Sequence, residues 1–172
     1  MANMLDRMIR AAMLDPKLYE EVEADRGALW QAMGVVVLAS IAGGVGSGHL
    51  GGFTGIFFGV IVALVAWFIW AGLTYLIGTK ILPEAQTRAD IGELLRTIGF
   101  SSSPGLLRVL GFIPGITWIV FFISGVWMLA AMVIAVRQAL DYRSTFRAVG
   151  VCVIGWVVQI IVMMLLMTLI RP

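Results

Sequence analysis

Five long, mostly apolar segments follow one another along the chain and restrict it to one class of fold. They cover residues 28–46, 53–78, 90–115, 116–136 and 148–170. A helix needs about 20 apolar residues to cross a bilayer, and inside hydrocarbon only helices or closed barrels satisfy their backbone groups. Charged residues make up only 13% of the chain, against about 25% in soluble domains. The sequence therefore predicts an all-α, polytopic membrane helical bundle with about five transmembrane helices.

The first 27 residues form a separate, charged segment. Apolar residues recur there at helical spacing, at Met4, Leu5, Met8, Ile9, Ala12 and Met13. This pattern predicts a short amphipathic helix that lies on the membrane surface. Asp15 and Pro16 favour the N-cap and first residue of a second, acidic helix, which we expect to face water. We therefore divide the chain into an N-terminal amphipathic and acidic helical segment, residues 1–27, and a five-helix transmembrane domain, residues 28–172.

The third apolar segment, residues 90–115, is unusual because its centre is polar. Asp90 and Glu93 have the spacing of a capping box, which predicts a helix beginning near Ile91. Pro104 lacks an amide donor and its ring clashes with the carbonyl of Phe100, so we expect a kink at this point. Hydroxyl groups of the neighbouring serines, residues 101–103, can satisfy the backbone groups that the kink leaves free.

Two arginines, Arg96 and Arg108, also lie in this segment. A charged side chain at the centre of a membrane helix costs about 2.5–3.5 kcal/mol on insertion scales, so it normally faces protein, water or a headgroup. One interpretation is that Arg96 reaches the inner headgroups and Arg108 the outer ones, and that the serines only repair the helix. The other is a kinked helix that lines a polar cavity. The candidate polar or partner site comprises Arg96, Ser101, Ser103, Pro104 and Arg108.

Two further sets of residues are candidates for lipid or partner contacts. The compact loop between the fourth and fifth segments carries Arg137, Asp141, Tyr142, Arg143 and Arg147, which either bind anionic headgroups or a partner, or simply anchor the loop. Gly55 and Gly59 have the GxxxG spacing that favours helix packing in membranes.

The distribution of Lys and Arg predicts the orientation of the bundle. With five spans and a cytoplasmic N-terminus, ten of these residues lie on the inner side, and only Arg108 and Arg171 lie on the outer side. The C-terminus is then outside. If residues 90–115 formed a re-entrant hairpin instead, the basic loop at residues 137–147 would move outside, against the positive-inside rule. Five spans fit the sequence better.

The residues that catalysis or metal binding would need are largely missing. The chain has one cysteine, Cys152, and one histidine, His49, too few for a disulfide framework or a Cys/His metal site. We read the N-terminal carboxylates as a solvated helix face; these are Asp6, Asp15, Glu20, Glu21, Glu23 and Asp25. No paired intramembrane aspartates, HExxH or phosphate-binding loop occurs. We expect no enzymatic activity, cofactor or metal, and the dispersed basic residues predict no nucleic-acid partner.

Three stretches resemble the bacterial branch of the Ypt-interacting protein family, also called the Yip-one domain. They are LLRTIGFSSSPGLLRVLGFIPGI at residues 94–116, VWML at residues 126–129 and AVRQALDYRSTFRAV at residues 135–149. The resemblance implies five membrane helices with a cytoplasmic N-terminus, here in a bacterial cytoplasmic (inner) membrane. Eukaryotic members of the family are associated with lipid-anchored Rab-type GTPases, but their DLYGP-type motif is absent from this chain.

Two functions agree with the sequence. The leading hypothesis is a non-enzymatic integral membrane protein that acts by association with membrane lipids and with a protein partner or a second copy of itself. It would serve as an accessory subunit of a complex or as an organiser of bilayer and partner helices. The alternative is a small channel or transporter for an anion or polar solute, with Arg96, Arg108 and the serines lining its path.

Overall fold

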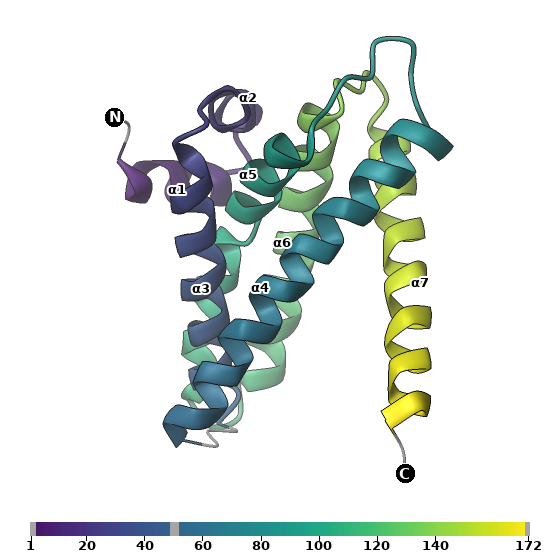
Figure 1. The fold of residues 1–172 in the computed structure, drawn as a ribbon. Helices are drawn as coiled ribbons and strands as arrows, with labels where there is room; N and C mark the ends of the chain where they lie inside the picture. Colours follow the sequence, from purple (N-terminus) through teal and green to yellow (C-terminus); the bar gives the residue numbers. More distant parts are fainter. Residues whose placement is uncertain (1–2, 49–51, 171–172) are drawn as a thin grey trace.

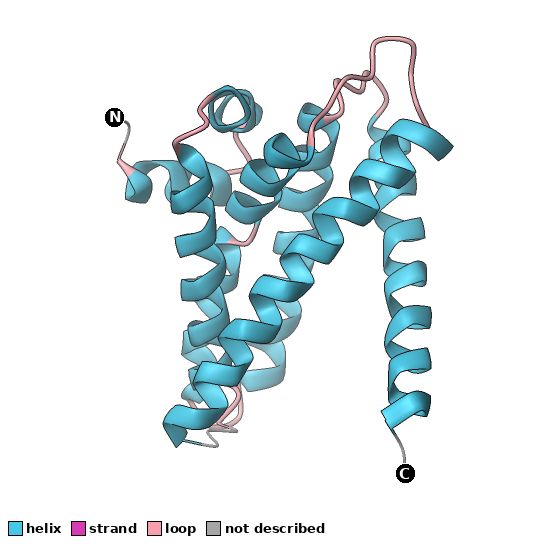
Figure 2. Cartoon of the chain, viewed as in Figure 1, coloured by secondary structure: helices cyan, strands magenta, loops and turns pink. Residues whose placement is uncertain are grey.

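A computed structural model describes residues 3–48 and 52–170; the predictions for His49 and Arg171 lie outside these ranges. Every regular element in the described part of the chain is a helix (Figure 2). The α-helices are α1 (Met4–Ala12), α2 (Pro16–Ala24), α3 (Ala28–Gly46), α4 (Gly52–Leu76), α5 (Ile91–Ser101), α6 (Thr117–Ala139) and α7 (Thr145–Ile170). A π-helical turn, η1 (Ile77–Ile81), extends α4, and a 3₁₀ helix, η2 (Ser103–Phe112), follows α5.

The predicted helical membrane bundle is confirmed. Three described helices are long and apolar enough to cross a bilayer, at Ala28–Gly46, Thr54–Ile81 and Thr117–Ala139. Helix α7 has 26 residues, and α5 with η2 supplies a further pass along the bundle. The N-terminal helices, the loop before α5 and the loop between α6 and α7 gather at one end, and the chain ends at the other (Figure 1).

The central segment is an α-helix followed by a 3₁₀ helix, which corrects the prediction of a single kinked helix. The predicted capping box is present: Asp90 Oδ1 accepts from the Glu93 amide at 2.8 Å, and Glu93 Oε2 accepts from the Asp90 amide at 2.7 Å. The α-helix ends at Ser101, just before Pro104. Beyond this point each residue rises about 2.0 Å instead of about 1.5 Å. The segment is therefore stretched, and not merely bent.

This stretched segment runs parallel to α3 in a regular register. A Cβ atom added at Gly99 would lie 2.7 Å from the Cβ of Ala32, and one added at Gly105 would lie 3.2 Å from the Cβ of Ala39. One added at Gly111 would lie 2.8 Å from the carbonyl oxygen of Gly46, the last residue of α3. The contacts thus recur every six residues in the central segment and every seven in α3. The segment follows α3 to its end, so it is not a re-entrant hairpin.

The N-terminal helices dock on the bundle. In α2, the side chains of Leu18, Tyr19 and Val22 are fully buried, and the indole of Trp127 in α6 donates to the carbonyl of Ala12 at 2.7 Å. The amphipathic helix is confirmed, and its exposed apolar side chains are Leu5, Ile9 and Met13. These three follow one another at four-residue spacing, so they form a single apolar stripe that faces away from the bundle.

Only part of the acidic face that the sequence suggested is freely solvated: Asp6 and Glu20 are exposed, but three other carboxylates pair with arginines of α1. Arg7 is 4% exposed and pairs with Glu21 at 2.9 Å and with Asp25 at 2.8 Å. Arg10 pairs with Asp15 at 2.9 Å and with Glu21 at 2.6 Å. Hydrogen bonds from Arg10 and then Arg7 lower the pKa of Glu21. The carboxylates therefore hold α1 against α2.

Candidate functional site

The side chain of Arg96, the first arginine of the central segment, caps the C-terminus of α2 and does not line the main cavity. Its side chain is only 7% exposed, and its Nε donates to the carbonyl of Val22 at 2.9 Å. Its Nη2 donates to the carbonyl of Glu23. These are among the last carbonyls of α2, which lack partners within the helix and carry partial negative charge. Neither interpretation from the sequence described this role, because the partner lies more than 70 residues away in the chain.

The serines around Pro104 repair the backbone as predicted. Ser103 Oγ donates to the carbonyl of Phe100 at 2.7 Å, which is the carbonyl that the proline leaves free. Ser101 Oγ donates to the carbonyl of Ile98 at 2.7 Å. Ser101, Ser103 and Pro104 are buried in the junction between α5 and η2 and do not line the main cavity. Their positions are those of helix repair.

Arg108, in contrast, extends into a space between helices. Its backbone lies against the end of α3 at Gly46, and its Cδ lies 3.8 Å from a Cβ built at Gly43. The guanidinium carbon lies 5.5 Å from the centre of the Phe121 ring, within cation–π range. Its Nε is buried and has no hydrogen-bond partner, and no carboxylate of the described residues pairs with it.

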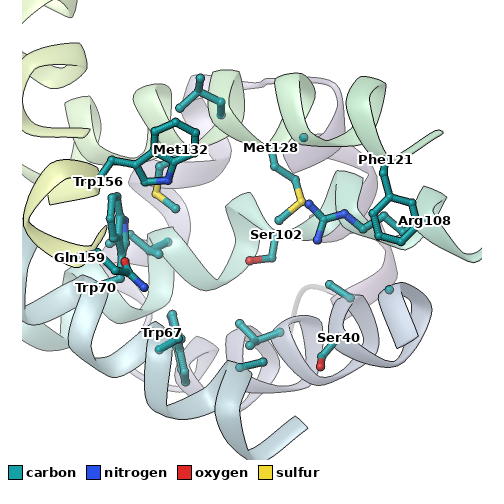
Figure 3. A pocket seen from close by; sticks show the side chains of 18 of the residues that line it. Ser40, Trp67, Trp70, Ser102, Arg108, Phe121, Met128, Met132, Trp156 and Gln159 are labelled. Atoms are coloured by element: carbon teal, nitrogen blue, oxygen red, sulfur yellow. The ribbon is translucent and has the colours of Figure 1, made fainter. Parts of the chain in front are cut away.

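The space that Arg108 enters is an apolar cavity of about 1030 Å³ between α3, α4, α6 and α7. Figure 3 shows Arg108 and Phe121 at one end and Trp70, Trp156 and Gln159 at the other. Met128 and Ser102 lie between these ends. Several lining side chains are exposed, including Trp156 at 63%, and α4 and α7 diverge toward the end of the bundle where α7 ends (Figure 1). The cavity therefore opens sideways, toward the region that lipid or a partner would occupy.

The sequence identified only one of the residues around this cavity as a site residue, namely Arg108. Ser102 was included only among the serines of the channel alternative, and the sequence missed the apolar lining; its principal members are Trp67, Trp70, Met128, Met132 and Trp156. The sequence did contain a sign of this lining. Tryptophans of membrane proteins are enriched at the interfaces, yet Trp67, Trp70 and Trp156 lie inside the spans. Trp67 is anchored by donating to the carbonyl of Leu95 at 3.1 Å, whereas the buried indole nitrogen of Trp70 has no partner.

The loop at residues 137–147 is docked on the loop that precedes α5. The amides of Arg143 and Ser144 donate to the Glu84 carboxylate at 3.0 and 3.2 Å, and Arg147 Nε lies 3.6 Å from Glu84 Oε1. These amide hydrogen bonds, led by the one from Arg143, lower the pKa of Glu84. Tyr142 is buried with its hydroxyl 2.8 Å from the carbonyl of Gly78, and burial raises its pKa to about 12.

The other two members of the predicted loop set have different surroundings. Arg137 Nε donates to the carbonyl of Tyr142 at 3.3 Å, and Asp141 adopts a φ of 53° in the turn after α6. The side chains of Arg143 and Arg147 are exposed, so this surface remains open to headgroups or a partner. The predicted loop residues thus lie together at one end of the bundle. Tyr142, however, is buried and bonded to Gly78, so its role is structural.

Among the carboxylates at this end of the bundle, Glu23 has the pKa that departs most from its ordinary value. Partial burial, and then repulsion from Glu93 and Asp141, raise its pKa to about 7. A second cavity of about 630 Å³ is lined by these three carboxylates together with Arg137 and Arg143. The described residues contain no group of three or more metal-ligating side chains placed to hold an ion.

Gly55 and Gly59 face away from the bundle. Both are exposed on α4, and nothing in the described part of the chain lies within 4 Å of a Cβ added at either position. The glycines that contact another helix lie elsewhere, in the central segment, in α3 and in α7, where Gly155 lies against Trp70 of α4. Gly55 and Gly59 contact none of the described residues, so they leave an open face on α4.

Comparison with known proteins identifies one family. A family model described as the Yip1 domain matches residues 11–167 of the chain, which is almost its whole length. No curated protein and no solved structure gives a significant match.

Proposed function

The chain belongs to the Yip1 domain family, and on this premise we propose that it is a non-enzymatic integral membrane protein that acts by association. It would serve as an accessory subunit of a membrane complex or as an organiser of bilayer and partner helices. The observation that carries the proposal is the apolar cavity between α4, α6 and α7, which opens sideways and has one unpaired cation at its end. A cavity of this kind suits a membrane component that enters from the bilayer.

The proposed orientation has the N-terminus in the cytoplasm and the C-terminus outside a bacterial cytoplasmic membrane. One end of the bundle carries α1, α2 and the loop at residues 137–147 (Figure 1). Most of the Lys and Arg residues belong to these elements and to the loop before α5. Cytoplasmic loops are enriched in these residues. The exposed apolar stripe of α1, with Leu5, Ile9 and Met13, supports a position at the membrane interface on the same side.

The test is the mass of the intact assembly. The protein would be extracted with its native lipids, without harsh detergent, and examined by native mass spectrometry. A retained lipid, a stoichiometric protein partner or a second copy of the chain is the expected result. A bare monomer that carries neither lipid nor partner would contradict association.

A channel or transporter for an anion or polar solute is the second candidate, favoured by the unpaired guanidinium of Arg108 inside the cavity. Because Arg96 is committed to α2, Arg108 would be the only arginine of the central segment on such a path. Flux into liposomes should then be abolished by Arg108→Leu and retained in Arg88→Leu, a change at an exposed loop residue. Equal flux in the wild type and in Arg108→Leu would remove this candidate.

A further inference from the structure

The cavity joins two chemically different parts, an unpaired cation and an apolar slot. Arginine stays protonated in proteins and donates from a planar fork, so its guanidinium needs an anion or several acceptors around it. In the described structure, Arg108 has only the face of Phe121, 5.5 Å from the guanidinium carbon. The apolar part begins beside it at Met128 and continues toward Met132 and Trp67 (Figure 3). The ligand should therefore be an amphiphile with an anionic end.

The depth of Arg108 matches a headgroup. Its carbonyl lies against Gly46, which is the last residue of α3, so Arg108 lies near the end of the bundle opposite α1 and α2. Long basic side chains near helix ends place their charge at the membrane interface. An anion bound there would lie at headgroup level, and an attached chain would run inward along the cavity.

The size of the cavity favours a lipid over a partner helix. A spanning helix of 20 residues, about 30 Å long and at least 10 Å across, fills roughly 2400 Å³. The cavity measures about 1030 Å³, which is less than half of that volume. It is comparable with the roughly 300–1000 Å³ of ordinary small-molecule sites. A helix would also have to bring a buried acidic residue to Arg108, whereas an anionic lipid carries its charge at the required end.

We propose that this cavity binds one anionic phospholipid, with its phosphate on Arg108 and an acyl chain between Met128, Met132 and Trp67. Arginine pairs with phosphate through two parallel hydrogen bonds. A headgroup that also carries a cation, such as choline, would place a second positive charge near the guanidinium, so the site prefers headgroups with a net negative charge. The inference rests on the proposed function, because it names the component with which the protein associates.

The first test measures lipid preference. The protein would be reconstituted in nanodiscs of phosphatidylcholine with a small fraction of phosphatidylglycerol, and retained lipids would be counted by native mass spectrometry. We expect the wild type to retain one phosphatidylglycerol in preference to phosphatidylcholine, and Arg108→Gln to lower this preference tenfold or more. Arg88→Gln removes an exposed charge far from the cavity and should leave the preference unchanged. Equal retention of both lipids by the wild type, or no change in Arg108→Gln, would overturn the proposal.

The second test blocks the slot and leaves the charge in place. Gly125 lines the cavity, and nothing lies within 4 Å of a Cβ built there, so the larger side chain of Gly125→Leu begins in open space. We expect it to lose the retained phosphatidylglycerol, whereas Gly72→Leu, also in open space but outside the cavity, should keep it. Excess inorganic phosphate should not displace the lipid, because it lacks the acyl chain. Displacement by phosphate alone would identify a free-anion site and refute the lipid.

The same spectra separate this proposal from the broader one. A stoichiometric protein partner or a dimer without preferred phosphatidylglycerol would refute the lipid site and leave association intact. A bare monomer in native lipids would refute both.

Discussion

The register between the central segment and α3 predicts that Gly99 cannot accept even a methyl group without moving α3. A Cβ at Gly99 would lie 2.7 Å from Ala32 Cβ and 3.1 Å from its carbonyl oxygen, and ordinary contacts begin at 3.4 Å. The two helices must therefore separate by about 0.7 Å. A gap of 0.5–1 Å forfeits a quarter to a half of the dispersion energy across the contact, and overpacking typically costs about 1–3 kcal/mol.

The net magnitude follows from two opposing terms. Alanine is a better helix former than glycine by about 1 kcal/mol, which offsets part of the cost. We expect Gly99→Ala to lower the free energy of unfolding by up to about 2 kcal/mol. Gly55→Ala makes the same chemical change on α4, where nothing lies within 4 Å, and should raise the free energy of unfolding by up to about 1 kcal/mol.

The measurement is reversible unfolding in mixed micelles, followed by the fluorescence of the six tryptophans. The two variants should differ from each other by up to about 3 kcal/mol, with Gly99→Ala below the wild type and Gly55→Ala above it. If Gly99→Ala matches Gly55→Ala, the close packing of the central segment against Ala32 is wrong.

Three further predictions concern the contacts that hold the two ends of the chain. Arg96→Met removes two charge-assisted hydrogen bonds, each worth about 1.5–3 kcal/mol. Hydrogen exchange across residues 16–24 should therefore accelerate while the spans stay protected. Arg26→Met, at an exposed position, should not have this effect. Ser103→Ala removes the hydroxyl that bonds to the Phe100 carbonyl and should lower the free energy of unfolding in micelles by about 1–3 kcal/mol. Ser102→Ala should lower it by less than about 0.5 kcal/mol. Equal losses in the two variants would contradict the repair of the kink. The pKa of Glu23 is raised to about 7 from the usual 4.5, so between these pH values the folded state holds a proton that the unfolded state releases. Stability therefore falls as pH rises from 4.5 to 7. Glu23→Gln should remove that fall in a pH series of unfolding midpoints, and an unchanged slope would refute the prediction.

Features that depend on neighbouring residues or on composition could be predicted before the fold was known. Asp90 and Glu93 cap the helix that begins at Ile91, and Ser103 satisfies the carbonyl that Pro104 frees, because each partner lies within four residues. The long apolar segments predicted the helical bundle, because inside hydrocarbon a backbone segment that is not part of a closed barrel satisfies its polar groups only as a helix. The local pattern did not show that the segment after Pro104 would wind as a 3₁₀ helix.

The contacts of the two arginines, and the glycines that pack against other helices, depend on how the helices are arranged in space. Arg96 and Arg108 are chemically alike in the sequence, yet one reaches carbonyls 73 and 74 residues away and the other ends in a cavity without a partner. Gly55 and Gly59 carry the recognised packing motif, but the described contacts between helices fall at other glycines, such as Gly99 against α3 and Gly155 against α4. The physical reason is that burial and contact depend on how helices align across the bundle, which the spacing within one helix does not specify.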